Sequence, residues 1–180
     1  VLFPVASPVM NIPSDYPVFL TTLKQKIKQE RMRVVLASNA ALIMLYWDIG
    51  RNILKKQEDD GWGAKIIDRL SADLSKEFSD MKGFSPRNLK YMKAFFAAWP
   101  DKSFVQQLAA QIPWFHNCVL IDRVKDSNTR EWYIRKTVQH GWSRNVLEMQ
   151  IDSHLHEREG KIVNNFKHTL SSAESDMAKQ

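Results

Sequence analysis

The 180-residue sequence contains a single cysteine, Cys118, and this scarcity restricts the class of protein. One thiol cannot form an internal disulfide, so the chain is not a disulfide-stabilised secreted domain. A reducing compartment, the cytoplasm, is expected instead. Apolar residues follow Cys118 directly in the sequence, and they predict a buried, unreactive thiol.

Long apolar runs are also scarce. No stretch of the sequence is expected to approach the ~18 apolar residues of a membrane span. Residues 2–9 are too short, and too broken by Pro4 and Pro8, to be the core of a signal peptide. We therefore expect no membrane partner. The chain starts at Val1 rather than at a methionine, so we expect a piece of a longer protein.

Motifs for catalysis are few. The sequence has no glycine-rich phosphate loop and no nucleophile elbow. Its five histidines lack the spacing of metal ligands. His154 and His156, for example, are two positions apart and would face different sides of a helix. We predict no catalytic residue, no metal site and no cofactor, so that this chain is not an enzyme by itself.

Positive charge is plentiful and is concentrated in two segments. The net charge is +6 and the isoelectric point is near 9.4. Residues 24–33 and residues 82–102 each hold five basic residues and one acidic residue. Together these segments carry more positive charge than the whole chain does. Such a focal distribution is typical of a protein with an anionic partner.

Residues 64–99 read as helix, tight turn, helix, and we expect the fold to be organised around them. Apolar residues recur at steps of three and four in the first half, which is the spacing of one buried helix face. Gly83 supplies the positive φ that a sharp reversal needs. Ser85 is a good N-cap, and Pro86 suits the first helical position.

The second predicted helix, residues 86–98, has an apolar face and a cationic face. This is the pattern of a helix-turn-helix, whose second helix offers its N-terminal half to DNA. An ordinary helical hairpin with a basic outer face has the same pattern. The candidate DNA-contacting residues are Arg87, Asn88, Lys90 and Lys93, with Lys82 expected to contact a phosphate.

A second segment repeats the start of that helix. Residues 141–147 match residues 83–89 in having a glycine, an aromatic residue, a serine cap, an Arg-Asn pair and an apolar anchor. Arg and Asn match the edges of guanine and adenine bidentately. Arg144 and Asn145 are therefore a second candidate DNA-contacting patch. The alternative is that both segments are simply good helix starts.

The other segments are mostly predicted helices. We expect an extended arm over residues 1–13, a helical domain over 14–160 and a linker or tail over 161–180. One helix is predicted to end near Glu30 and a long one to cover residues 32–57, with another helix crossing it closely at Gly50. Further predicted elements are a short helical piece at 105–112, a buried helix or strand at 114–124, and helices at about 127–140 and from 144 to near 160.

Five ordered motifs resemble the N-terminal domain of the YhcG-like family. They are LYWDIGR at 45–51, GWG at 61–63, KGFSPRNL at 82–89, QIPWFHN at 111–117 and GWSRNVL at 141–147. The resemblance runs from about Tyr16 to Phe166. In this bacterial family of unknown function, the domain precedes a PD-(D/E)XK nuclease domain. The resemblance implies a helical, winged-helix-like DNA-binding part and a catalytic domain that lies outside this chain.

We therefore expect an all-α, multi-helical domain with one helix-turn-helix unit, or two. Its expected function is to bind double-stranded DNA and to target the nuclease domain of the parent chain. Helix-turn-helix proteins often pair to read two half-sites, so a homodimer is a further candidate partnership. The alternative is a protein-interaction or dimerisation module, formed by the helix at 32–57 and the tryptophans, with no contact to nucleic acid.

Overall fold

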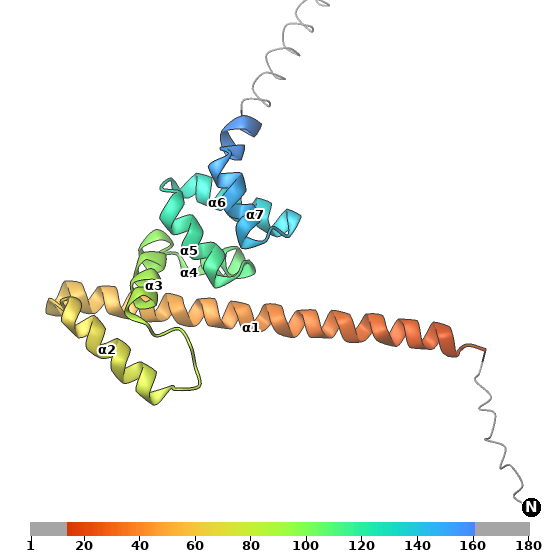
Figure 1. Ribbon diagram of the computed structural model, residues 1–180, viewed down its shortest axis with the longest axis horizontal. Helices are drawn as coiled ribbons and strands as arrows, with labels where there is room; N and C mark the ends of the chain where they lie inside the picture. The colour runs from red at the N-terminus through yellow and green to blue at the C-terminus, as the bar shows by residue number, and fades with distance from the viewer. Residues whose placement is uncertain (1–13, 161–180) are drawn as a thin grey trace, which may run out of the picture. The chain divides into compact units, whose positions relative to one another are not determined.

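The computed structural model describes residues 14–160, and all its regular elements in that range are helical (Figure 1). The all-α prediction is confirmed for these residues. The predicted arm at 1–13 and tail at 161–180 lie outside the described residues. The elements are α1 (Tyr16–Asp60), α2 (Ala64–Glu77), α3 (Pro86–Ala98), α4 (Lys102–Gln107), the 3-10 helix η1 (Ala109–Gln111), α5 (Trp114–Arg123), α6 (Ser127–His140) and α7 (Arg144–Asp152).

The described residues divide into two compact units, residues 14–38 and residues 39–160. Helix α1 contributes to both units as one continuous helix. The prediction of two helices separated after Glu30 is therefore wrong. Residues 18–49 contain neither proline nor glycine, so nothing in the backbone interrupts the helix there.

Helix α3 crosses α1 at Gly50 in the second unit. A Cβ atom on Gly50 would lie 2.0 Å from the carbonyl oxygen of Met92, so only glycine fits at this crossing. This confirms the close approach predicted at Gly50. Ile43 and Trp47 of α1 are buried beside the crossing, and the indole Nε1 of Trp47 donates to the carbonyl of Trp99 at 2.7 Å.

Helix α1 also meets the criterion for a membrane span by length and composition. The prediction that no stretch approaches such a span is wrong on that criterion. However, Ile43, Tyr46 and Trp47 of this helix are buried in the hydrophobic core of the second unit. Only 17% of its most apolar stretch is buried in the described structure, and a buried core helix or a signal sequence can have the same length and composition, so these two properties are weak evidence for a membrane span.

The start of α3 has the predicted cap. Ser85 Oγ accepts a hydrogen bond from the backbone N–H of Asn88 at 3.2 Å, and Pro86 is the first helical residue. Gly83 has φ of +132°, as expected for the reversal. The connection from α2, residues 78–85, is longer than the three or four residues of a helix-turn-helix. The helix-turn-helix assignment is not confirmed, and residues 14–160 contain no strand that would form a wing.

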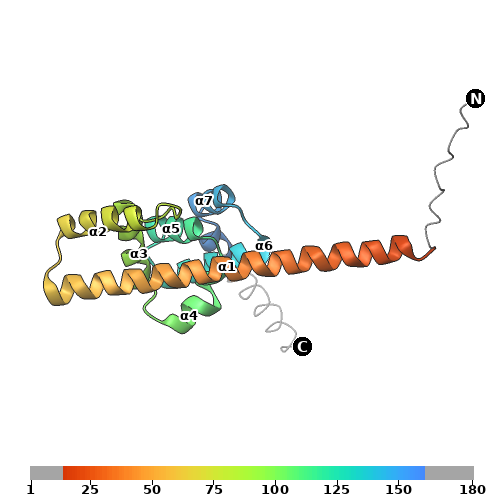
Figure 2. The ribbon, with the colours of Figure 1, turned by 90° about the horizontal axis from the view of Figure 1, so that it is seen from below.

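Helix α5 is the centre of the second unit and packs against α3, α6 and α7 (Figure 2). Residues 114–123 are helical, which resolves the helix-or-strand alternative. The predicted helical piece at 105–112 is instead α4 followed by η1. Asp101 caps α4 by accepting from the N–H of Ser103 at 2.8 Å.

Helices α6 and α7 begin with side-chain caps. Asp126 accepts from the N–H of Thr129 at 2.7 Å, and Gly141 ends α6 with φ of +62°. Helix α7 ends at Asp152, because the backbone turns at residues 153–154 before helical residues resume at 155–160. The prediction of an uninterrupted helix to near residue 160 is wrong. His154 has φ of +54° at this turn. Residues 152–155 contain no glycine or proline from which the end of the helix could be predicted.

Candidate nucleic-acid interface

The two repeated segments lie on the same hollow in the second unit. The hollow has a volume of about 830 Å³, and Leu42 and Tyr46 of α1 form part of its wall. The rest is formed by three helices, the N-terminal parts of α3 and α7 together with α5. It has a mixed lining of apolar, cationic and acidic side chains, and its cations come from all three helices and the loop before α3. These cationic residues are Lys82, Arg87, Arg123 and Arg144. We call this hollow the groove.

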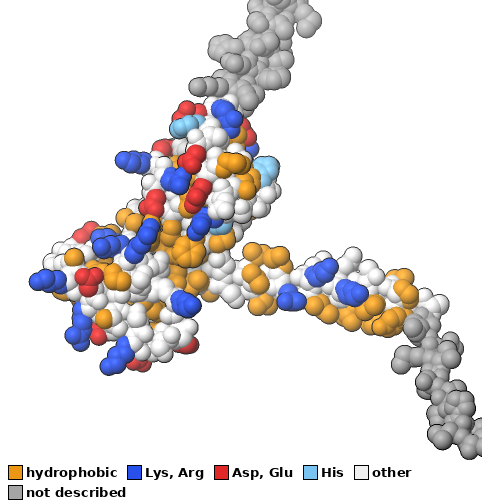
Figure 3. Space-filling model, in the orientation of Figure 1, with side chains coloured by type: hydrophobic (Ala, Val, Ile, Leu, Met, Phe, Trp, Pro, Cys, Tyr) orange, Lys and Arg blue, Asp and Glu red, His pale blue; other side chains and the backbone are white. Residues whose placement is uncertain are grey.

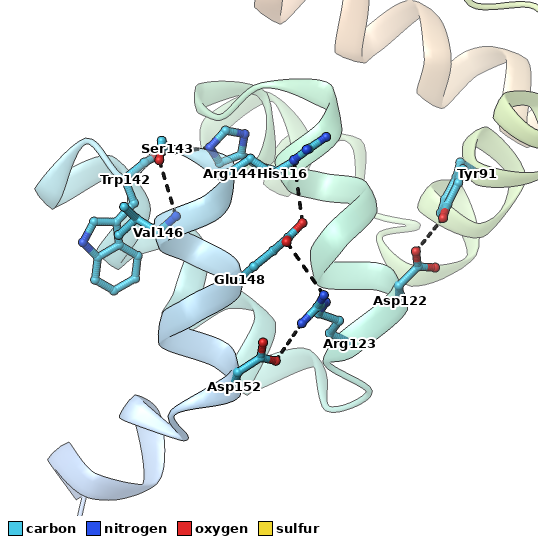
Figure 4. Close-up of polar contacts among 10 residues, drawn as sticks. All are labelled: Tyr91, His116, Asp122, Arg123, Trp142, Ser143, Arg144, Val146, Glu148 and Asp152. Atoms are coloured by element: carbon cyan, nitrogen blue, oxygen red, sulfur yellow. Dashed lines mark hydrogen bonds and ion pairs between the residues drawn. The ribbon is translucent and has the colours of Figure 1, made fainter.

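Arg87 lies on the α3 side of the groove and takes part in a short polar chain. Its Nη2 donates to the hydroxyl of Tyr91 at 3.4 Å, and its guanidinium lies 5.7 Å from the centre of that ring. The Tyr91 hydroxyl donates in turn to Asp122 Oδ2 at 2.5 Å (Figure 4). The pKa of Arg87 is raised, mainly by this hydrogen bond with Tyr91. Arg87 is exposed and cationic.

Ion pairs connect α5 and α7 on the other side of the groove. Glu148 lies between two cations, 3.7 Å from Arg144 Nε and 3.8 Å from Arg123 Nη2 (Figure 4). Arg123 Nη1 also contacts Asp152 Oδ1 at 2.6 Å. Exposed ion pairs of this kind are worth at most about 1 kcal/mol. Their arginines can therefore exchange a carboxylate for a phosphate at small cost.

The groove carries more positive than negative charge. Four cationic side chains line it, against the two carboxylates of Asp122 and Glu148. Figure 3 shows apolar surface over the region of α3 and α5, with Lys and Arg side chains around it. The groove thus combines a cationic rim with an apolar interior.

Asn88 has both ends of its side-chain amide engaged inside the protein. Its Nδ2 donates to the carbonyl of Gly83 at 2.6 Å, and its Oδ1 accepts from Trp114 Nε1 at 2.7 Å. These bonds connect the loop before α3 to the start of α5. The geometry gives Asn88 a structural role in this state of the protein.

The predicted cationic row of α3 is divided in the structure. Arg87 lines the groove, whereas Lys90 is exposed but is not among the residues that line it. Lys93 is half-buried, and its Nζ donates to Gln57 Oε1 of α1 at 3.0 Å. None of the three is paired with a carboxylate in the described part of the chain.

Arg144 and Asn145 border a second hollow of about 370 Å³ at the N-terminal ends of α5 and α7. His116 of α5 also borders it, and its Nε2 lies 3.0 Å from the carbonyl oxygen of Trp142. Since a carbonyl only accepts, Nε2 is the donor in this bond. It connects the turn before α7 to α5, as Asn88 connects the turn before α3.

Comparison with known proteins identifies the family. The profile of the DUF1016 N-terminal domain matches residues 22–158, most of this chain. The chain belongs to this family. The YhcG-like resemblance is confirmed by a second match, to the protein named "Putative nuclease YhcG" of Escherichia coli (strain K12). The identity is 27% over 165 residues, which cover 73% of this chain and 43% of that protein. The chain thus spans less than half the length of this relative. No solved structure matches the chain.

Several groove residues of this DUF1016 N-terminal domain were not predicted. Arg123 has no neighbouring motif, and Tyr91 and Asp122 meet only in three dimensions. Phe115 stands in a strongly apolar run and was predicted to be buried, yet 63% of it is exposed. Its position as the second residue of α5, next to a helix end, is the signal that could have indicated exposure.

Residues 14–160 contain no group of His, Cys, Asp and Glu side chains that could hold a metal ion. Cys118 lines the groove but is buried. Burial is the main cause that raises its pKa to about 12, so its thiol stays protonated at neutral pH and is a poor nucleophile.

Proposed function

We propose that this domain binds double-stranded DNA in the cytoplasm and targets the nuclease domain of its parent protein to that DNA. The convergence of the two repeated segments on one cationic groove carries the proposal. Phosphate contacts supply most of the affinity of DNA-binding proteins, and they need cations that are exposed and close together. The relative in Escherichia coli is named as a putative nuclease, and DNA targeting is a role that such a protein needs.

The candidate residues divide into three groups under this proposal. Lys82 and Lys90 are exposed lysines suited to phosphates, as point charges on flexible chains. Arg87, Arg144 and Asn145 are exposed near helix N-termini and are suited to phosphates or base edges. We leave Asn88 and Lys93 outside the contact set, because both are half-buried and bond within the protein, whereas Arg87 and Arg144 are exposed.

A salt titration of duplex binding tests the proposal. Fluorescence anisotropy of a labelled 20-base-pair duplex is measured at several salt concentrations, for the full chain and for a Lys82→Ala/Lys90→Ala variant. The variant should bind every duplex more weakly, and the slope of log K against log salt should fall by about one per lost phosphate contact. A Lys55→Ala/Lys65→Ala variant is the matched control, since it removes two exposed lysines that lie neither on the groove nor on α3.

Equal affinities and equal salt slopes for the two double variants would reject this surface. Failure of the unmodified chain to bind duplex at low salt would reject the proposed function itself.

A second candidate function, binding of a partner protein, is favoured by the first unit. Between Tyr16 and Ser38, α1 exposes many large apolar side chains, and Figure 3 shows apolar and basic side chains together on this segment. Positions 16, 20, 23, 27, 30 and 34 follow alternating steps of four and three, the spacing of a coiled-coil seam. The apolar seam residues are Tyr16, Leu20, Leu23, Ile27 and Val34, of which Leu20 is half-buried. The remaining seam position is Glu30, which is paired with Arg33 at 3.1 Å.

Charge beside this seam selects the kind of partner. The flanking positions are all basic where they are charged, namely Lys24, Lys26, Arg31 and Arg33. Two copies of this helix would place like charges opposite each other in either orientation, which opposes a homodimer. The better partner is a helix with acidic flanks.

Mixing experiments test this second function. Light scattering after size exclusion should show a monomer for the chain alone. It should show a complex with a peptide that has leucine at seam positions and glutamate at flanking positions. Ile27→Asp should abolish the complex, while Gln25→Asp, away from the seam, should retain it. A stable homodimer that Ile27→Asp disrupts would contradict the argument from flanking charge.

A further inference from the structure

Phe115 is an exposed aromatic residue at the centre of the candidate interface. It is the second residue of α5, and its neighbours Trp114 and His116 are both buried. Phe115 and Arg144 each line both the groove and the smaller hollow beside it, so the two hollows meet at this pair. With 63% of its surface exposed, Phe115 contributes little to the hydrophobic core. Its packing does not explain its position.

The groove has walls of two kinds around this ring. Its apolar side is formed by Leu42, Tyr46, Trp114 and Val119, and its cations are those named above. A duplex offers only phosphates and base edges to a protein surface, because its base faces are stacked. A nucleotide outside the stack offers a flat apolar face together with its phosphate. Proteins that bind such nucleotides combine exposed aromatic rings with a cationic groove.

The dimensions of the groove suit a nucleotide. Small-molecule sites typically have volumes of about 300–1,000 Å³, and the groove, at about 830 Å³, lies within this range. A protein partner would also bury Phe115. However, four cationic side chains from three helices and a loop line the groove together with the ring, against two carboxylates, and a cationic groove with an exposed aromatic ring is typical of proteins that bind unpaired nucleotides. The charge favours a nucleotide.

We propose that the groove takes an unpaired nucleotide of duplex DNA, whose base stacks on Phe115 and whose phosphates lie against Arg144 and Arg87. This inference rests on the proposed DNA-binding function and specifies its substrate. The preferred DNA is a duplex with a gap, a mismatch or a frayed end. The double-stranded DNA on either side of the unpaired nucleotide contacts the exposed Lys82 and Lys90. The unpaired nucleotide enters the groove.

Two probes of equal length separate this inference from DNA binding in general. One is a duplex whose ends are closed by hexaethylene glycol linkers, so that it has no unpaired nucleotide, and the other is the same closed duplex with a gap that leaves four thymidines unpaired. The full chain should bind the gapped probe about tenfold more tightly, since stacking of one base on an aromatic ring is worth about tenfold or more in affinity. Phe115→Ala should remove this preference, so that the ratio of the two affinities falls to about one.

Two further variants define the role of the ring. Phe115→Trp should retain the preference, because it keeps an aromatic face. Met149→Ala is the matched control, since Met149 is also a large exposed apolar residue but lies outside both hollows. It should behave as the unmodified chain. Because Phe115 and Met149 are both exposed, thermal melting curves should be close to that of the unmodified chain for all these variants.

The outcomes distinguish the two levels of the proposal. If the full chain binds neither probe, the DNA-binding function fails, and the stacking site fails with it. If it binds both probes equally and Phe115→Ala changes nothing, DNA binding stands and the stacking site is wrong. An equal loss on both probes for Phe115→Ala would make the ring a general contact and would also overturn the inference.

Discussion

Replacing Asn88 by alanine separates the structural role of this residue from the base-reading role that its motif suggests. The substitution removes the acceptor of Trp114 Nε1 and the donor to the carbonyl of Gly83. Trp114 is only 6% exposed, so its indole N–H would be left without a partner and largely without water. Gly83 is partly exposed, and water can replace the lost donor there.

The magnitude follows from these two environments. A buried donor that loses its partner costs about 1–3 kcal/mol, and a lost neutral hydrogen bond near solvent costs about 1 kcal/mol. Asn88→Ala should therefore lower the free energy of unfolding by about 2–4 kcal/mol. For a domain of this size, that loss lowers the melting temperature by about 4–16 °C. It is a large fraction of the about 5–15 kcal/mol that stabilises a typical domain.

The matched control is Asn145→Ala, the asparagine of the second Arg-Asn pair, which is one residue closer to its serine cap than Asn88 is. Asn145 is exposed, and its side chain makes no hydrogen bond within residues 14–160. Its replacement should change stability by less than about 0.5 kcal/mol. Urea titrations followed by circular dichroism give both values. Equal stabilities for the two variants would refute the structural assignment of Asn88 and would return it to the set of DNA contacts.

Three more predictions concern packing, charge and the buried thiol. Gly50→Ala should destabilise the domain by about 3 kcal/mol in urea unfolding, because its Cβ would overlap a backbone carbonyl of α3. Gly63→Ala, where nothing lies within 4 Å of the added Cβ, should cost less than about 1 kcal/mol. Glu148→Gln removes a carboxylate from between Arg123 and Arg144, so it should tighten duplex binding several-fold at low salt in the anisotropy assay; unchanged affinity would contradict the groove. Because the pKa of Cys118 is raised to about 12 by burial, the native thiol should resist disulfide reagents at pH 8. The unfolded chain loses that proton at lower pH than the native chain does, so stability should fall as the pH rises above about 9, towards 12. Rapid labelling of the folded protein would contradict this.

The sequence predicted best those features that depend on a few neighbouring residues. Ser85 caps its helix as expected, because an N-cap bond needs only the next three residues. Gly83 and Gly50 were also assigned correctly, one by its turn and one by its cost within a helix. The break expected after Glu30 was wrong because clustered charge was taken as a helix end, and charge alone does not interrupt backbone hydrogen bonding.

The candidate site was less accessible to sequence reasoning, because it depends on contacts between distant segments. Asn88 bonds to Trp114 of α5, and Lys93 bonds to Gln57 of α1. The bond from Arg87 to Tyr91 lies within α3 and depends on the side-chain conformations. The periodicity of apolar residues in the sequence does not predict any of these bonds. Phe115 illustrates the same limit. An apolar run predicts burial of its members on average, but the first turn of a helix can leave one of them exposed.

The repeated Arg-Asn segments acquire a meaning in the fold that their sequences alone do not give. In both segments, a serine caps a helix whose first turn reaches the groove, and a polar side chain connects the preceding turn to α5. Asn88 makes that connection for α3, and His116 of α5 makes it for α7. The two segments therefore differ in which residue is structural. The arginines, Arg87 and Arg144, are what they share at the groove, and it follows that these arginines, rather than the asparagines, are the common element of the proposed DNA contact.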